Sequence, residues 1–434
     1  MIQNVEVKMW GTTIGYLHMD RNKPYAAYEY DQNFIQSGIQ VAPLYMPLSN
    51  RVFEFPNLAE TAFRGVPGMI ADSLPDKFGN AIINKWISSR GMTEPDFNVL
   101  DRLCYTGSRG MGALEYIPAN GPVALDDESV NIKEMVRFAS EILQSRSHVE
   151  FNWKDNLTKA QLLQLGTSAG GARAKAIIAW NQQTGDVRSG QTHLKDGYDY
   201  WIIKFDGVSQ NGDHGLEDQP QYTKIEYAYY KMACLAGIIM NDCQMLEENG
   251  AYHFMTKRFD RVEGKKVHMQ TLGAIGHIDY NIPGLCSYEQ AVVYMRKMGL
   301  LQSEIKQFYR RMVFNVLAVN QDDHVKNVSF LMDKEGRWSL SPAYDITFSY
   351  DKTNRWLSAH QMLINGKSEH ILLEDLLNAG KNMGISSVTC KNIIDEVQHA
   401  VAQWMSLADQ VGIRESTAKA IEKIITENDI EKND

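Results

Sequence analysis

The stretch Asn320-Gln-Asp-Asp-His-Val-Lys-Asn327 places two acids, a histidine, a lysine and two amides directly after an apolar segment. Apolar residues between Ile305 and Leu317 recur every three or four positions, which predicts a helix with one buried face. After the stretch, residues 328–340 alternate as two short strands around a turn, which is typical of a hairpin. We therefore expect a polar loop between a buried helix and a hairpin.

The residue types in this loop suit phosphoryl transfer. This reaction needs an acceptor for the substrate hydroxyl proton and oxygen ligands for Mg²⁺, and Asp322 followed five residues later by Asn327 supplies both. The hairpin leads to Asp345, which we expect near Asn327 as a second magnesium ligand. These residues could instead be ordinary polar helix-end and turn residues. The hairpin between Asn327 and Asp345 matches the order of a kinase active site and favours the catalytic interpretation.

A glycine-rich stretch, Gly166-Thr-Ser-Ala-Gly-Gly-Ala-Arg-Ala-Lys175, precedes an apolar strand. Backbone amides in such a loop can approach phosphate oxygens closely. The stretch is not a Walker A loop, because Gly171 is followed by Ala172 and Arg173. A simple connecting loop remains the alternative.

Lys204 stands inside the apolar run from Trp201 to Phe205, which predicts a strand. A charge in a buried strand is costly unless it has a partner. A ligand phosphate or a helix carboxylate, with Glu226 the nearest candidate, would supply that partner. A solvated lysine on an edge strand is the alternative.

Composition limits the class of protein. The chain has 434 residues, enough for two or three domains, and its net charge of −9 gives no global attraction to nucleic acid or anionic lipid. Five scattered cysteines favour reduced thiols, and we expect a cytoplasmic protein that does not bind membranes. Residues 118–128 favour turns and predict a domain boundary near residue 120. A single long helix is expected from about Val388 to Val411, ended by Gly412.

Ordered motifs between residues 40 and 350 resemble the HipA family of bacterial toxin kinases. The motifs are Pro43-Leu-Tyr-Met-Pro47, Ser73-Leu-Pro-Asp76, Gly107 to Gly112, the loop around Ser168, Ile202-Ile-Lys204, Lys257-Arg-Phe-Asp-Arg261, Asp322 to Asn327 and Tyr344-Asp345. The resemblance implies a two-lobed, protein-kinase-like α+β fold with an extra N-terminal α/β subdomain. The expected domains are an N-terminal subdomain (1–120), a kinase N-lobe-like region (121–262) and a mainly helical C-terminal lobe (263–434).

The resemblance also implies roles for individual residues. Asp322 would be the catalytic aspartate, with His324, Lys326 and Asn327 around phosphate and metal, and Asp345 as the second Mg²⁺ ligand. Ser168 would be a site of inhibitory autophosphorylation. The implied ATP-binding residues are Gly170, Gly171, Ala172, Arg173, Ala174, Lys175, Lys204, Lys257, Arg258, Phe259 and Tyr344. Two positions depart from the family pattern: Asp323 stands where glycine is common, and Lys257 where an acid is frequent. Asp323 could alter the loop geometry or add negative charge near phosphate.

Family members act with a small helix-turn-helix antitoxin that binds operator DNA, and their known targets include aminoacyl-tRNA synthetases. The resemblance therefore implies an ATP-dependent serine/threonine kinase with a HipB-like antitoxin, a protein substrate, and DNA contact mainly through the antitoxin. Two other functions remain open from the residues: a small-molecule or lipid kinase of related fold, and a nucleotide-binding scaffold that co-represses with a DNA-binding partner.

Overall fold

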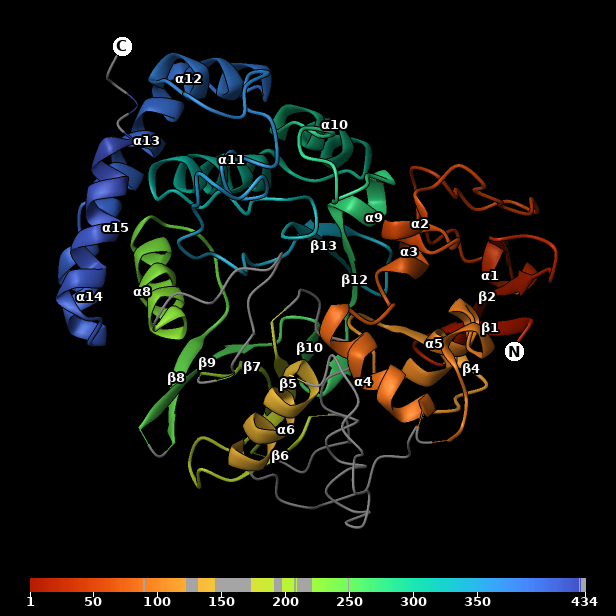
Figure 1. The fold of residues 1–434 in the computed structure, drawn as a ribbon. Coiled ribbons are helices and arrows are strands. Elements are labelled where there is room, and N and C mark those ends of the chain that lie inside the picture. The colour runs from red at the N-terminus through yellow and green to blue at the C-terminus, as the bar shows by residue number, and fades with distance from the viewer. Residues whose placement is uncertain are drawn as a thin grey trace. The chain divides into compact units, whose positions relative to one another are not determined.

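The computed structural model describes residues 1–88, 90–121, 132–144, 173–190, 197–206, 208, 221–248, 250–428 and 430 (Figure 1). Two compact units are present. Unit 1 comprises Met1–Val41, Met46–Thr223 and Cys243–Met269, and unit 2 comprises Ala42–Tyr45, Lys224–Asp242 and Gln270–Asp434. The expectation of an α+β fold is confirmed, because both helices and sheets are present.

Unit 1 begins with a four-stranded antiparallel sheet in the order β3-β2-β1-β4. Its strands are β1 (Asn4–Met9), β2 (Thr12–Met19), β3 (Ala26–Tyr30) and β4 (Leu114–Ile117). Alternation of apolar and polar residues in β1 buries one face, as expected of a strand with one solvated side. Helices between β3 and β4 are α1 (Gln32–Ile35), α2 (Glu60–Phe63), α3 (Gly68–Ala71), α4 (Lys77–Ser88), the 3₁₀ turn η1 (Glu94–Asp96) and α5 (Val99–Thr106).

A second sheet of unit 1 has five antiparallel strands in the order β6-β5-β7-β9-β8. The strands are β5 (Lys175–Trp180), β6 (Val187–Ser189), β7 (Asp199–Lys204), β8 (Cys243–Glu248) and β9 (Ala251–Lys257). Apolar side chains of β5, β7 and β9 join those of α4 and of α6 (Ile132–Gln144) in one buried cluster. The short hairpin of β10 (Arg261–Val262) and β11 (Lys265–Lys266) follows β9.

Unit 2 is mainly helical. Its short strands β13 (Ser329–Met332) and β14 (Trp338–Leu340) form the expected hairpin, and β12 (His268–Thr271) lies beside β13 in a sheet of three. Helix α11 (Gln302–Leu317) buries an apolar face that packs against α10 (Tyr288–Lys297) and α13 (Ser387–Val401). The other helices are α8 (Tyr222–Leu235), α9 (Leu272–Gly276), α12 (Leu373–Asn382), α14 (Trp404–Val411) and α15 (Glu415–Glu427).

The prediction of one helix over 388–411 is wrong, because the chain leaves the helix at Ala402 and starts α14 at Trp404. The bend buries the indole of Trp404, which is 2% exposed and packs edge-on against Tyr229 at 5.4 Å. Its Nε1 donates a hydrogen bond to the Ala418 carbonyl oxygen at 2.9 Å. Tertiary packing thus overrides a helical period that runs through the break.

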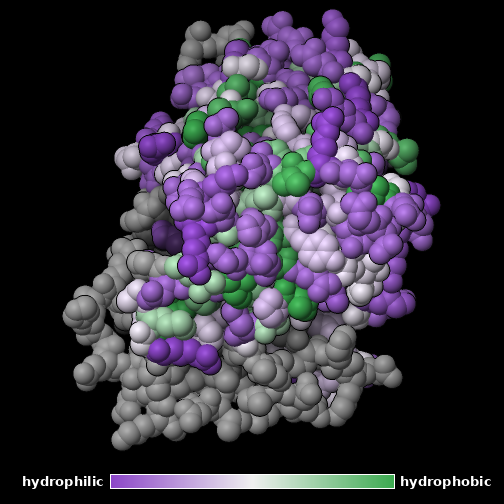
Figure 2. Space-filling model, turned by 90° about the vertical axis from the view of Figure 1, so that its right-hand side faces the viewer, coloured by the Kyte–Doolittle hydropathy of each residue, from purple (hydrophilic) through white to green (hydrophobic). Residues whose placement is uncertain are grey.

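The surface seen in Figure 2 is mainly hydrophilic with small apolar areas between the polar side chains, as in an ordinary globular protein. Among the helices that the structure describes, none combines the length and apolar character needed to cross a membrane.

Candidate functional site

The polar loop begins where α11 ends, and it is tied to the helix. Asn320 donates from its backbone N–H to the Asn315 carbonyl at 2.9 Å and from Nδ2 to the Asn315 Oδ1 at 2.9 Å. The Gln321 N–H donates to the Ser349 carbonyl, and the Ser349 N–H donates to the Val319 carbonyl. These bonds satisfy backbone groups that a loop would otherwise leave to water, so the loop has a defined path.

Asp322 and Asn327 are brought together within this loop. The Asn327 Nδ2 donates to the Asp322 carbonyl oxygen at 2.8 Å, so the other polar atom of this amide, Oδ1, is not used by that bond. The Asp322 side chain is 45% exposed, and His324 Nε2 lies 3.7 Å from its Oδ1. Lys326 places its Nζ over the ring of Tyr280, 4.6 Å from the centroid. A solvent-accessible carboxylate therefore stands beside the His324 imidazole, and Lys326 follows four residues later in the same loop.

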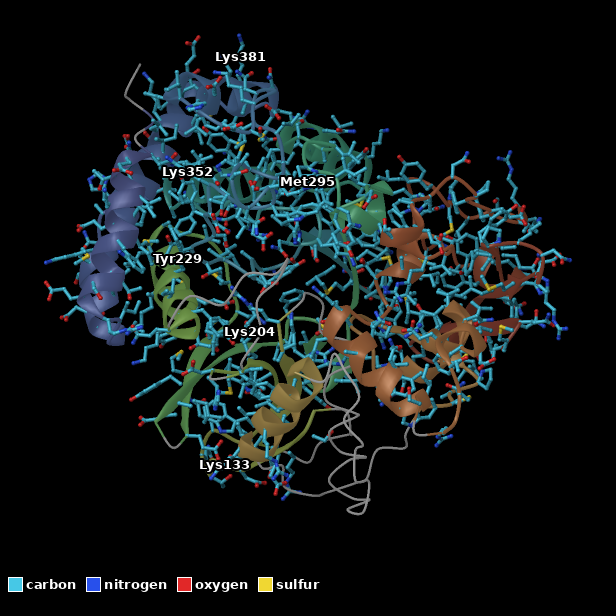
Figure 3. The ribbon with its side chains drawn as sticks, viewed as in Figure 1. Lys133, Lys204, Tyr229, Met295, Lys352 and Lys381 are labelled. Carbon is cyan, nitrogen blue, oxygen red and sulfur yellow. The ribbon has the colours of Figure 1, made fainter. Side chains whose placement is uncertain are left out.

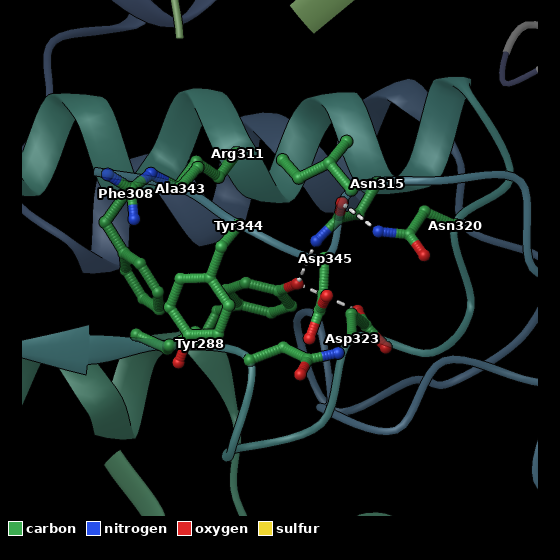
Figure 4. A pocket seen from close by; sticks show the side chains of 12 residues that line it. Tyr288, Phe308, Arg311, Asn315, Asn320, Asp323, Ala343, Tyr344 and Asp345 are labelled. Atoms are coloured by element: carbon green, nitrogen blue, oxygen red, sulfur yellow. Dashed lines mark hydrogen bonds between the residues drawn. The ribbon is translucent and has the colours of Figure 1, made fainter. Parts of the chain in front are cut away.

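Asp345 lines a small pocket together with Asn327 and Tyr344 (Figure 4). Its backbone has φ of +53°, a conformation that few residues other than glycine adopt. The Tyr344 hydroxyl donates to the Lys326 carbonyl at 2.7 Å, which ties the strand exit to the polar loop. The pocket has a volume of about 20 Å³, enough for about one water molecule or one ion.

The donor atoms of this pocket suit Mg²⁺. Carboxylate and amide oxygens are the ligands that this hard cation prefers, and Asp345 and Asn327 supply one of each. Within the described ranges, no group of three or more His, Cys, Asp or Glu side chains could hold a metal. A magnesium ion here would therefore keep waters or take phosphate oxygens as its other ligands.

Unit 1 buries the predicted phosphate-binding lysine. Lys204, labelled in Figure 3, is 6% exposed. It lies directly opposite Lys175, which is 4% exposed, on the neighbouring strand β5. Its Nζ is 5.8 Å from the ring centroid of Phe254 on β9. The edge-strand alternative is wrong, because β7 is the middle strand of its sheet. Like charges at one cross-strand position are unfavourable to each other, so an anion bound near this position would be stabilising.

The glycine-rich stretch is only partly described. Ser168, Gly170, Gly171 and Ala172 lie outside the described residues. Ala174 is fully buried in the core cluster. The Arg173 guanidinium lies over the ring of Tyr222, 4.7 Å from the centroid.

In the segment 257–259, the side chains of Lys257 and Arg258 are each paired with an acid, and Phe259 is partly exposed. Lys257 pairs with Asp199 at 2.8 Å near the surface. The Arg258 side chain is 1% exposed and donates to both carboxylate oxygens of Asp260, at 2.8 and 2.7 Å. An adenine contact from the Arg258 guanidinium would require that buried pair to break.

Sequence reasoning missed a buried cluster that joins this segment to the N-terminal subdomain. Asp260 accepts a hydrogen bond from the Gly112 N–H at 2.7 Å, and Arg261 donates to the carbonyls of Gly110 and Gly112, each at 3.0 Å. Burial raises the pKa of Asp260, but the charges of Arg258 and Arg261 outweigh it and hold that pKa well below its usual range. The motifs Gly107 to Gly112 and Lys257 to Arg261 are both visible in the sequence, but nothing in the sequence indicates that they contact each other.

Comparisons with known proteins identify the family. The model of the HipA-like C-terminal domain matches residues 167–405, and that of the HipA N-terminal domain matches residues 5–117. The chain is 27% identical over 165 residues to a Haemophilus influenzae protein named "Putative kinase" and 26% identical over 167 residues to "Putative kinase Y4dM" of Sinorhizobium fredii. These matches cover 33% and 34% of this chain, and 48% and 36% of the two relatives.

Among solved structures, the HipA toxin–antitoxin complex of Shewanella oneidensis MR-1 with HipB and operator DNA has a similar fold, with a TM-score of 0.64 at 15% identity. The match covers 98% of this chain and 95% of that one. It confirms the expected HipA-like fold. Since the C-terminal model alone matches more than half of the residues, the chain belongs to the HipA family.

Proposed function

We propose that this protein is an ATP-dependent serine/threonine-protein kinase and the toxin of a toxin–antitoxin pair. The observation that carries the proposal is the polar loop of unit 2, where Asp322 and Asn327 are joined and Asn327 shares a pocket with Asp345. Family membership and the names of the two curated relatives support the same activity.

In the proposed mechanism, Asp322 accepts the proton of a serine or threonine hydroxyl as that oxygen attacks the γ-phosphorus of ATP, and ADP leaves. Its partial exposure lets a protein hydroxyl reach the carboxylate. Asn327 and Asp345 would hold Mg²⁺, which neutralises charge on the phosphates. His324 stands beside Asp322, and Lys326 lies in the same loop with its Nζ over Tyr280; both side chains could stabilise negative charge as it develops. The Tyr344 hydroxyl donates to the Lys326 carbonyl and so fixes the backbone of the loop next to the pocket.

Lys204 and Lys175 are the proposed contacts to the nucleotide phosphates. Both lysines are buried at one cross-strand position, so a polyphosphate bound there would be attracted by two positive charges. Ser168, in the glycine-rich stretch before β5, is the proposed autophosphorylation site. A phosphoryl group there adds close to two negative charges and would compete with ATP for the same cations.

The proposed partner is a HipB-like helix-turn-helix antitoxin, because the solved relative is a complex of HipA with HipB and operator DNA. A net charge of −9 is consistent with DNA contact mainly through the antitoxin. The proposed substrate is a protein, with aminoacyl-tRNA synthetases as the first class to test.

The test is transfer of labelled γ-phosphate from ATP with Mg²⁺ by the full chain, to itself and to candidate proteins. Asp322→Asn and Asp345→Asn should each reduce transfer by on the order of 100-fold or more. Asp333→Asn is the matched control, because Asp333 lies in the exposed hairpin turn and pairs with Arg337. It should leave transfer unchanged.

The outcomes separate the alternatives. Label in a metabolite or lipid but in no protein would indicate a small-molecule or lipid kinase. ATP binding without turnover would indicate a nucleotide-binding co-repressor scaffold. Full transfer by the purified, folded Asp322→Asn variant would refute the proposed active site.

A further inference from the structure

Asp323 is the neighbour of the proposed catalytic aspartate, but its side chain points the other way. The Asp323 carboxylate is 1% exposed, whereas that of Asp322 is 45% exposed. Burial alternates from residue 321 to 326: Gln321, Asp323 and Val325 are buried, whereas Asp322, His324 and Lys326 are only partly buried. Those three outward residues, Asp322, His324 and Lys326, all belong to the proposed active site.

Three donors from two separate segments satisfy the buried carboxylate. The Gln361 N–H donates to Asp323 Oδ1 at 2.7 Å, and the Tyr288 hydroxyl donates to Oδ2 at 2.8 Å. His360 Nδ1 lies 3.0 Å from Oδ2, and because a carboxylate only accepts, this contact requires the proton on Nδ1. A buried carboxylate without such donors would be strongly unfavourable, so the network fixes where Asp323 lies.

The network continues into the core of unit 2 (Figure 4). Asn315 on α11 donates from Nδ2 to the Tyr288 hydroxyl at 3.0 Å, and its Oδ1 accepts from Asn320 at the start of the loop. Burial, followed by the nearby Asp323 charge, raises the pKa of Tyr288 well above its usual value, so the hydroxyl keeps its proton. Asp323 is thereby anchored to two helices and to the segment that contains Gln361.

The alternation of buried and partly buried side chains means that the position of Asp323 also affects the direction of the Asp322 side chain. Along this part of the loop the buried Asp323 is flanked by two residues, Asp322 and His324, that are only partly buried. Holding Asp323 inward therefore holds Asp322 outward, with His324 two residues further on the same side. A glycine at position 323, common in the family, would have no side chain to make this anchor.

We propose that Asp323 is a positioning residue that orients Asp322 for proton transfer by fixing the loop to Tyr288, His360 and Gln361. This inference rests on the proposed kinase function. It predicts that the rate of phosphoryl transfer depends on Asp323 more strongly than nucleotide affinity does. Asp323 also lines the pocket of Asn327 and Asp345, but both of its carboxylate oxygens are engaged by Gln361, Tyr288 and His360.

The experiment measures kcat and the KM for ATP in the full chain. Asp323→Ala should lower kcat by on the order of 100-fold, the cost of misplacing a reacting group by about 1 Å, with the KM for ATP changed less than about threefold. Asp323→Asn keeps the oxygen that accepts from the Gln361 N–H, so it should recover part of the lost kcat. A structural role alone would lower the unfolding temperature of the variants without this separation of kcat from KM.

Tyr288→Phe provides a milder variant should Asp323→Ala fold poorly. Its matched control is Tyr309→Phe, since the Tyr309 hydroxyl is also buried in unit 2 but donates to the Leu376 carbonyl, away from the loop. We expect about a tenfold lower kcat for Tyr288→Phe and a wild-type kcat for Tyr309→Phe. Amide hydrogen exchange at Gln361 should speed up in Tyr288→Phe and in Asp323→Ala only.

These measurements distinguish the two hypotheses. An inactive wild-type protein would refute the proposed function, whereas the exchange rate at Gln361 would still report the anchor. An active wild type with unchanged kcat in Asp323→Ala and Tyr288→Phe would overturn the positioning role. Equal losses of kcat in Tyr288→Phe and Tyr309→Phe would also overturn it, because they would indicate a general effect of stability.

Discussion

Replacing Asp260 by alanine should be among the most destabilising single changes in unit 1. The Asp260 side chain is fully buried and accepts hydrogen bonds from Arg258, Arg261 and the Gly112 N–H. Without it, two guanidinium groups that are 1% and 7% exposed lose their shared counter-charge. The Gly112 N–H also loses its acceptor.

Removing one partner of a buried ion pair costs about 3–5 kcal/mol, because it leaves an uncompensated charge inside the protein. For a cooperative unit of about 150–250 residues, each kcal/mol lowers the unfolding temperature by about 2–4 °C, so we expect a decrease of roughly 6–20 °C. Differential scanning calorimetry of the full chain at neutral pH measures this shift. Glu54→Ala is the control: Glu54 pairs with Lys23 at the surface at 2.7 Å, and its loss should not shift the transition measurably.

A second variant separates charge imbalance from lost packing. If uncompensated charge is the cause, adding Arg258→Met to Asp260→Ala should raise the unfolding temperature above that of Asp260→Ala alone. Because the folded pKa of Asp260 is lowered, its contribution is present above the unfolded value of about 4 and is lost as pH falls through the folded pKa. A decrease under about 2 °C for Asp260→Ala, or further destabilisation by Arg258→Met, would refute the reasoning.

Lys204→Met should raise the KM for ATP at least about tenfold without lowering the unfolding temperature, as kinetics and calorimetry can measure; an unchanged KM with lower stability would indicate a structural ion pair. Ser168→Ala should stay active after incubation with ATP and Mg²⁺, whereas the wild type should lose activity as peptide mass mapping finds phosphate on Ser168. Burial lowers the pKa of His277 to about 4, so the folded state resists protonation that the unfolded chain accepts near 6.5. Folding stability should therefore fall by about 1.4 kcal/mol per pH unit from about pH 6.5 towards 4, and His277→Asn should reduce this slope in urea unfolding at pH 7 and pH 5.

Local spacing determined much of the candidate site. Asp322, Asn327 and Asp345 lie within one helix–loop–hairpin unit, and the period of α11 and the alternation of β13 and β14 are visible without tertiary information. Short loops leave few ways to place such residues, so a pocket shared by Asn327 and Asp345, with Asp322 bonded to Asn327, could be expected from the sequence. The burial of Lys204 followed in the same way from the apolar run around it.

Tertiary structure alone decided which polar residues became internal anchors. Asp323 and Asp260 stand in polar motifs where exposure would be the ordinary expectation, yet their partners Tyr288, Gln361 and Gly112 are far away in the chain. The break before Trp404 has the same origin, because its indole bonds to another helix. Sequence periodicity records which face of one element is apolar. It does not indicate which distant donor will form a hydrogen bond with a buried carboxylate, and that hydrogen bond decides which way each side chain points.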